Sequence, residues 1–205
     1  VEVARALIDR GADINKADDN ETTPLFVASQ NGHMEVVRVL AERGADINKA
    51  MNNGTTPLYM ASQNGHVNVV RVLIDRGADI NKADDDGATP LFIASLEGHV
   101  EVVKILIERG ADINKAMNDG YTPLYTASHQ GHEEVVKILI ERGADINKAR
   151  DGGYTPLYLA SQQGHLDVVM ILVERGADMN KADNDGCTPL YIASHKGHVE
   201  VVRVL

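Results

Sequence analysis

Two short apolar segments alternate along this chain with polar, glycine-containing stretches. In a representative stretch, the first apolar segment follows Thr89 and Pro90, which are favoured at the N-cap and the first position of a helix. This predicts a helix over 90–97. The second segment has a broad apolar face and an acidic residue in its first turn, which predicts a helix over 100–109. Gly110 then follows, where a left-handed C-terminal cap is expected.

The same pattern returns every 33 residues, and a Gly-His step always separates the two apolar segments. The histidine of this step occurs six times, at His33, His66, His99, His132, His165 and His198. A fixed period of about 20–50 residues is typical of stacked supersecondary units, in which each unit packs on its neighbours. The pattern therefore predicts an all-α array of helix pairs, in which the histidines form hydrogen bonds at the reversal between the two helices.

Four motifs at this spacing, Thr-Pro-Leu-x-x-Ala, Gly-His, Val-Val-x-x-Leu and Gly-Ala-Asp, resemble those of ankyrin repeats over the whole chain. The resemblance implies an ankyrin-repeat solenoid: a curved array of stacked antiparallel helix pairs with projecting hairpin-like loops. It also implies a concave partner-binding face, made of the loop tips and the first helix of each repeat. Glu21 departs from the family pattern because it replaces the glycine of the first complete turn, and we expect that turn to be less regular than the others.

The repeat boundaries follow from the period, and we expect one array over 1–205. It comprises a partial repeat at 1–17 (second helix and loop), full repeats at 18–50, 51–83, 84–116, 117–149 and 150–182, and a nearly complete last repeat at 183–205. Neither end carries the polar terminal repeat that keeps solenoids soluble. We therefore expect a fragment of a longer array or a chain trimmed to its ordered part, whose apolar ends favour end-to-end self-stacking.

Composition narrows the classes of partner. The chain has 30 acidic and 20 basic side chains and a net charge of −10, which is unsuited to a nucleic-acid backbone. Its apolar runs are shorter than the roughly 18 residues of a membrane span, so we expect no membrane insertion. Cys187 is the only cysteine, which fits a reducing, cytoplasmic location. The glycosylation sequons at Asn20 and Asn53 are expected to be unused, because nothing else indicates secretion.

Candidate chemistry is repeated rather than unique. Ser29, His33 and Asp46 suggest a nucleophilic trio, but the same trio recurs in every complete repeat, whereas an enzyme needs one such site. His129-Gln-Gly-His132 and His195-Lys-Gly-His198 have metal-like spacing, but no cysteine or carboxylate completes a tetrahedral set. We therefore predict no catalytic residue, no cofactor and no metal.

The aromatic residues point to a binding surface. Six occupy one column after Thr-Pro-Leu and are expected to pack between neighbouring first helices: Phe26, Tyr59, Phe92, Tyr125, Tyr158 and Tyr191. Tyr121 and Tyr154 instead lie in loops expected to project into solvent, in a column that otherwise holds small residues. They suggest exposed interface anchors, and simple drift of the loop sequence is the alternative interpretation.

Loop tips and first-helix ends also vary most between repeats. Our candidate partner-binding residues in these regions are Leu96, Glu97, Met117, Asp119, Tyr121, His129, Gln130, Arg150, Asp151, Tyr154, Gln162 and Gln163. We predict a non-catalytic scaffold for protein–protein interaction, with the strongest contacts around Met117, Tyr121, Arg150 and Tyr154.

Two alternatives stay open. The chain is an architectural spacer within a longer ankyrin array, such as that of a channel or membrane adaptor, or it is an engineered ankyrin binder. The irregular framework residues Glu21, Met51, Arg150 and Met179 favour a natural origin.

Overall fold

The computed structural model describes residues 1–205, apart from the side chain of Ala4, and its described residues form thirteen α-helices and no strand. The first helices of the repeats are α2 (Pro24–Gln30), α4 (Pro57–Gln63), α6 (Pro90–Leu96), α8 (Pro123–Gln130), α10 (Pro156–Gln163) and α12 (Pro189–Lys196). The second helices are α1 (Glu2–Asp9), α3 (Met34–Glu42), α5 (Val67–Asp75), α7 (Val100–Glu108), α9 (Glu133–Glu141), α11 (Leu166–Glu174) and α13 (Val199–Val204). The predicted all-α solenoid of helix pairs is confirmed.

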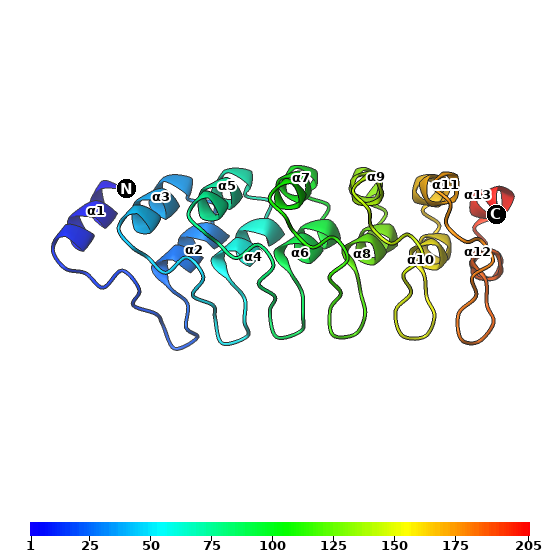
Figure 1. Ribbon diagram of the computed structural model, residues 1–205, viewed down its shortest axis with the longest axis horizontal. Coiled ribbons are helices and arrows are strands. Elements are labelled where there is room, and N and C mark those ends of the chain that lie inside the picture. The colour runs from blue at the N-terminus through cyan, green and yellow to red at the C-terminus, as the bar shows by residue number, and fades with distance from the viewer. The chain divides into compact units, whose positions relative to one another are not determined.

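The chain forms two compact units, which we describe separately. Unit 1 comprises residues 1–94 and 101–111, and unit 2 comprises residues 95–100 and 112–205. In unit 1, α2 packs on α4 and α3 packs on α5. In unit 2, α10 packs on α8 and α12, while α11 packs on α9 and α13. Each unit thus has a layer of first helices and a layer of second helices, and its loops project beyond the first-helix layer (Figure 1).

Each first helix begins where the sequence indicates. Thr122 Oγ1 accepts a hydrogen bond from the backbone N–H of Tyr125 at 3.2 Å, and Pro123 occupies the first helical position. The helices predicted over 90–97 and 100–109 end one residue earlier than expected, within the usual spread of helix bounds. Gly110 has a φ of +95°, which confirms the predicted left-handed cap.

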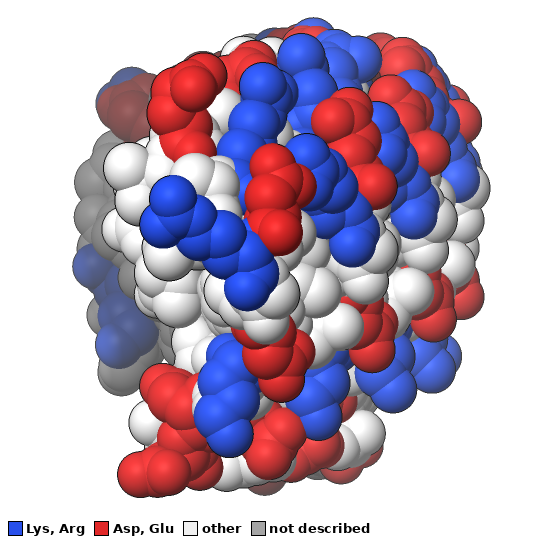
Figure 2. All heavy atoms as spheres, turned by 90° about the vertical axis from the view of Figure 1, so that its left-hand side faces the viewer, with Lys and Arg blue, Asp and Glu red and all other residues white. Residues whose placement is uncertain are grey.

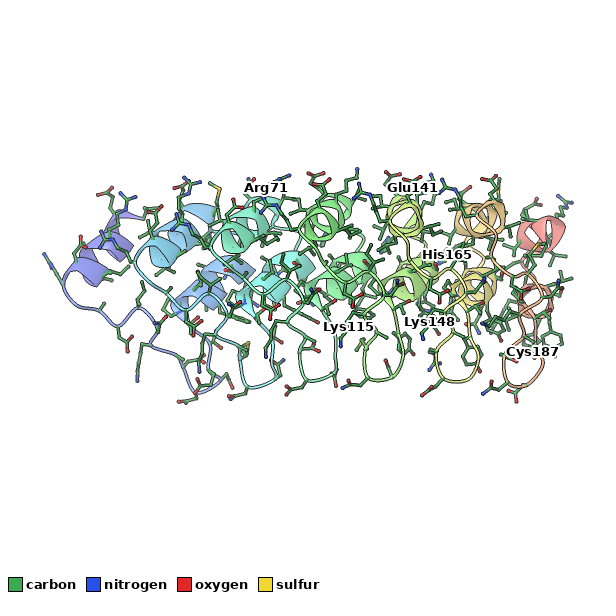
Figure 3. All side chains as sticks on the ribbon, in the orientation of Figure 1. Arg71, Lys115, Glu141, Lys148, His165 and Cys187 are labelled. Atoms are coloured by element: carbon green, nitrogen blue, oxygen red, sulfur yellow. The ribbon has the colours of Figure 1, made fainter. Side chains whose placement is uncertain are left out.

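The histidine of the Gly-His step joins adjacent repeats. His165 Nε2 lies 2.9 Å from the carbonyl oxygen of His129, at the end of the preceding first helix (Figure 3). The hydrogen bond predicted at the reversal is therefore confirmed, and its acceptor belongs to the neighbouring repeat. The glycine before the histidine leaves room for the histidine ring of the next repeat, since a Cβ on Gly131 would lie 2.8 Å from His165 Nδ1.

Asparagine side chains join the loops of neighbouring repeats. Asn114 Oδ1 accepts a hydrogen bond from the backbone N–H of Asp145 at 2.9 Å, and its amide donates to the carbonyl of Gly143 at 3.2 Å. Asn48 makes the same two contacts, with Asp79 and Gly77. These bonds satisfy backbone groups that helix ends leave unpaired, which explains why each repeat carries this asparagine.

Ion pairs link the second helices on the opposite surface. Arg175 Nη2 lies 3.0 Å from Glu141 Oε1, and Arg109 Nη1 lies 2.7 Å from Asp75 Oδ1. These side chains are well exposed, so each pair contributes little to stability. Figure 2 shows basic and acidic side chains interspersed on the face it presents, rather than gathered into a basic patch of the kind that binds nucleic acid.

Glu21 keeps the geometry of the glycine that it replaces. Its φ is +64°, in the left-handed region that favours glycine. Its N–H donates to the carbonyl of Asp18 at 3.0 Å, as the N–H of Gly54 does to the carbonyl of Met51 in the next loop. The expectation of a less regular first turn is therefore wrong: the turn is regular, and the glutamate adopts an unfavourable backbone conformation to maintain it.

Replacing Glu21 by glycine is expected to stabilise unit 1 by about 0.5–1 kcal/mol, because glycine adopts this conformation without steric strain. The gain is reduced by loss of the exposed contact between Glu21 Oε2 and Lys49 Nζ, at 2.7 Å. Urea denaturation followed by circular dichroism would measure the change. Glu21→Gln is the matched control, since it removes the ion pair and keeps the strain. Equal midpoints for Glu21→Gly and the wild type would contradict this account.

Candidate functional site

The aromatic column after Thr-Pro-Leu lies mostly inside the first-helix layer. Its first five members are buried: Phe26, Tyr59, Phe92, Tyr125 and Tyr158. Tyr191 on α12 is 57% exposed. Packing between neighbouring first helices, as predicted, is confirmed for the buried members.

The two loop tyrosines pack on this column. Tyr121 meets Tyr125 edge to face, with ring centroids 4.9 Å apart and an interplanar angle of 88°. Tyr154 meets Tyr158 with centroids 5.0 Å apart. Both loop tyrosines are half-buried, so the expectation that they project freely into solvent is wrong. The loops place these rings against the first helices, because contact with a buried aromatic ring is more favourable than exposure to water.

Arg150 joins the two tyrosine pairs. Its guanidinium carbon lies 4.8 Å from the ring centroid of Tyr121 and 5.1 Å from that of Tyr154. Its Nε donates a hydrogen bond to the hydroxyl oxygen of Tyr125 at 2.8 Å. Three residues that break the repeat pattern (Tyr121, Arg150 and Tyr154) therefore meet in space, and with Tyr125 they form what we call the tyrosine–arginine cluster.

Arg150 reverses the charge that three other repeats carry at this position, as Asp18, Asp84 and Asp183. Asp183 occupies the same column one repeat later, where its buried carboxylate lies close to the hydroxyl of Tyr158. Burial, followed by this contact with Asp183, raises the pKa of Tyr158. In the preceding repeat Arg150 donates to Tyr125 instead. The group beside the tyrosine hydroxyl thus changes from a negative carboxylate to a positive guanidinium that donates a hydrogen bond.

A pocket of about 160 Å³ lies beside the cluster in unit 2. Its lining consists of Tyr121, Tyr125, Thr126, His129, Arg150, Leu159 and Gln162. His129 Nε2 lies 3.1 Å from Gln163 Nε2 and is the acceptor of that hydrogen bond, because an amide nitrogen only donates. Burial and the neighbouring His165 lower the pKa of His129, which keeps its ring neutral at neutral pH.

The structure thus brings together five of the predicted residues, namely Tyr121, His129, Arg150, Tyr154 and Gln162, with Gln163 bonded to His129. The others do not line this pocket: Leu96, Glu97, Met117, Asp119, Gln130 and Asp151. Three pocket residues were missed by sequence reasoning, namely Tyr125, Thr126 and Leu159. One feature of the sequence could have identified Tyr125. It lies 25 residues before Arg150, as Tyr158 lies 25 residues before Asp183.

Most copies of the repeated serine and histidine have structural partners, whereas the buried Oγ of Ser161 has none among the described residues. Ser29 is buried, and its Oγ donates to the carbonyl of Leu25 at 2.7 Å, the bond to the preceding helical turn. The hydroxyl therefore has its hydrogen-bond acceptor within its own helix. Within the described residues, no three His, Cys, Asp or Glu side chains are arranged to hold a metal ion. None of the described helices combines the length and the apolar character needed to cross a bilayer.

Cys187 packs half-buried against the hydrophobic cluster that contains Tyr158 and Ile192, and Figure 3 shows its place at a loop of unit 2. Burial, together with the carboxylates of Asp183 and Asp185, raises the pKa of its thiol. The thiolate is the reactive form, so we expect alkylation by iodoacetamide at pH 8 to be at least about threefold slower in the folded protein than in urea. Timed mass spectrometry would measure both rates, and equal rates would contradict the assigned environment.

Comparison with known proteins gives one clear result. The family model described as ankyrin repeats (3 copies) matches residues 1–84, 79–151 and 147–205, which together span the chain. A search of curated proteins found no match.

Proposed function

Because the chain belongs to the ankyrin repeat family, whose members are generally protein–protein interaction modules, we propose that it is a non-catalytic scaffold that binds a partner protein. The proposed face consists of the loop tips and first-helix ends of unit 2, from Leu96 and Glu97 through Met117 to Gln163. The observation that carries this proposal is the tyrosine–arginine cluster. Tyrosine and arginine are the residue types that dominate interface energetics, and here they meet at the projecting loops of adjacent repeats.

The remaining surface of unit 2 supports this choice. The second helices carry exposed charged side chains joined in pairs, such as Arg175 with Glu141, and charged residues are depleted at the centre of interfaces. The loop tips instead combine half-buried aromatic rings with a pocket. Stacked repeats hold these groups in place before binding, so association orders few side chains.

Site-specific photo-crosslinking tests the proposed face without assuming the partner's chemistry. A benzophenone amino acid would replace Asp119, Gln130 or Gln163, each of which is exposed on the proposed face. We expect a discrete partner to be crosslinked from these positions in a lysate and to be absent without light.

Matched controls come from the second-helix surface of the same unit. Asp167, Met170 and Glu174 on α11 are also exposed, and the same benzophenone would be placed there. We expect these positions to give little of the crosslinked partner. Crosslinking of that partner from α11 as strong as from the loop tips would contradict the proposed face.

A further inference from the structure

Arg150 is a cation held without an anionic partner. Its Nε bonds to Tyr125, and its guanidinium lies beside two aromatic rings, but no carboxylate among the described residues lies within ion-pair distance. Its two terminal nitrogens donate no hydrogen bond within the described part of the chain. A half-buried charge normally has a counter-charge, so the open edge of this guanidinium points to an anion from outside the chain.

The guanidinium is fixed before any ligand arrives. The rings of Tyr121 and Tyr154 attract its positive charge, and the hydroxyl of Tyr125 sets its orientation. A planar guanidinium presents two parallel N–H groups, which match the two oxygens of a carboxylate. Little side-chain entropy is left to lose, which favours binding of such a group.

We propose that Arg150 and the adjoining pocket bind one carboxylate of the partner, from an aspartate or glutamate side chain or from a chain terminus. This inference rests on the proposed interaction function and adds the chemistry of its central contact. The pocket of about 160 Å³ is smaller than the roughly 300–1,000 Å³ of small-molecule clefts, so it suits a single side chain. Gln162 and Thr126, whose side chains carry hydrogen-bond donors, line the same pocket.

The charges around the site favour a carboxylate over a phosphate. Arg150 supplies one positive charge, and His129 is neutral at neutral pH because its pKa is lowered. Asp119 and Asp151 stand exposed at the same two loop tips. Arg150 is the only lysine or arginine among the residues that line the pocket, so a phosphate dianion would be half-neutralised there and repelled by both aspartates, whereas a carboxylate carries a single charge.

Nuclear magnetic resonance of the ¹⁵N-arginine-labelled protein tests this directly through the Nε–H signal of Arg150. The probes are acetyl-Ala-Glu-Ala-amide and its glutamine counterpart, acetyl-Ala-Ala-Ala with a free or an amidated terminus, and inorganic phosphate. We expect saturable shifts with the carboxylate probes and at least about tenfold weaker binding of the amide counterparts. Whether the glutamate peptide or the free-terminus peptide binds more tightly identifies the source. The signal of Arg175, which is already paired with Glu141, is the internal control and should not move.

Two substitutions separate recognition from folding. Arg150→Asp restores the residue found at Asp183, where the carboxylate accepts hydrogen bonds from two loop N–H groups, so the loop should fold and carboxylate binding should be lost. Arg150→Lys keeps the charge without the planar fork and should bind several-fold more weakly.

Four results would overturn the proposal. The first is an Arg150 signal that responds no more to carboxylates than to sodium chloride of equal ionic strength. The second is tighter binding of phosphate than of carboxylates. The third and fourth are binding of the carboxylate peptides by Arg150→Asp, or by Arg150→Lys, that is as tight as binding by the wild type. Failure of the two proposals is distinguishable, because the peptide titration needs no natural partner. Carboxylate binding without loop-tip crosslinks would leave the pocket assigned and reject the scaffold face. Loop-tip crosslinks without carboxylate binding would support the scaffold face and reject the carboxylate pocket.

Discussion

Replacing Tyr121 and Tyr154 together by alanine is expected to weaken binding of the crosslinked partner by more than about 2 kcal/mol, roughly 30-fold in Kd. Both rings supply contact area at the loop tips, and both hold the guanidinium of Arg150 at 4.8 and 5.1 Å. The double substitution therefore removes two aromatic anchors and leaves the arginine held by its hydrogen bond to Tyr125 alone. Isothermal titration calorimetry with the purified partner would measure the loss.

The chain offers matched controls for this result. Tyr121→Phe with Tyr154→Phe keeps both rings over Arg150 and should retain most of the affinity. Tyr191→Ala removes a tyrosine that is 57% exposed on α12, away from the cluster, and should bind normally. Unchanged affinity of the double alanine variant, with its helical content intact by circular dichroism, would contradict the importance of the loop tyrosines.

Leu139→Ala is expected to lower the free energy of unfolding by about 3 kcal/mol. Leu139 lies on α9 with none of its surface exposed, so alanine would leave a cavity inside unit 2. In a solenoid, stability is approximately a sum over repeats and their interfaces, so the loss should be concentrated in the repeats that contact α9. Urea denaturation would give the overall change, and hydrogen exchange would show where protection is lost.

Leu190→Ala is the control for this cavity. The same side chain is shortened in the same unit, but Leu190 is 41% exposed, so the change should be less than about 1 kcal/mol. Similar losses for Leu139→Ala and Leu190→Ala would contradict the assignment of the core.

The fold was predictable because the residues that start and end the helices recur in each repeat. Thr-Pro fixes the start of each first helix, and glycine fixes the end of each second helix from α1 to α11, through contacts only a few residues apart. Hydrogen bonds of the histidine column were also predictable, because the histidine recurs at the same reversal between helices in each repeat. Its acceptor was not predicted, because His165 reaches 36 residues back to His129 in the neighbouring repeat.

The site was only partly predictable. Breaks in the period identified Tyr121, Arg150 and Tyr154 as unusual, but their meeting depends on how two projecting loops lie against the first helices. The role of Tyr125 was hidden because its column is filled by structural aromatics in every repeat. The conformation of Glu21 was also hidden, since neighbouring hydrogen bonds can hold a residue in a backbone region that its own preference disfavours.

The central claim is that a partner protein binds the loop tips of unit 2. Nuclear magnetic resonance of the ¹⁵N-tyrosine-labelled protein tests it most directly, because the chain has only six tyrosines. On addition of the partner, we expect the backbone signals of Tyr121 and Tyr154 to shift, while those of Tyr59 and Tyr191 stay in place. Shifts confined to Tyr59 or Tyr191, or a bound partner that moves none of the six signals, would contradict the claim.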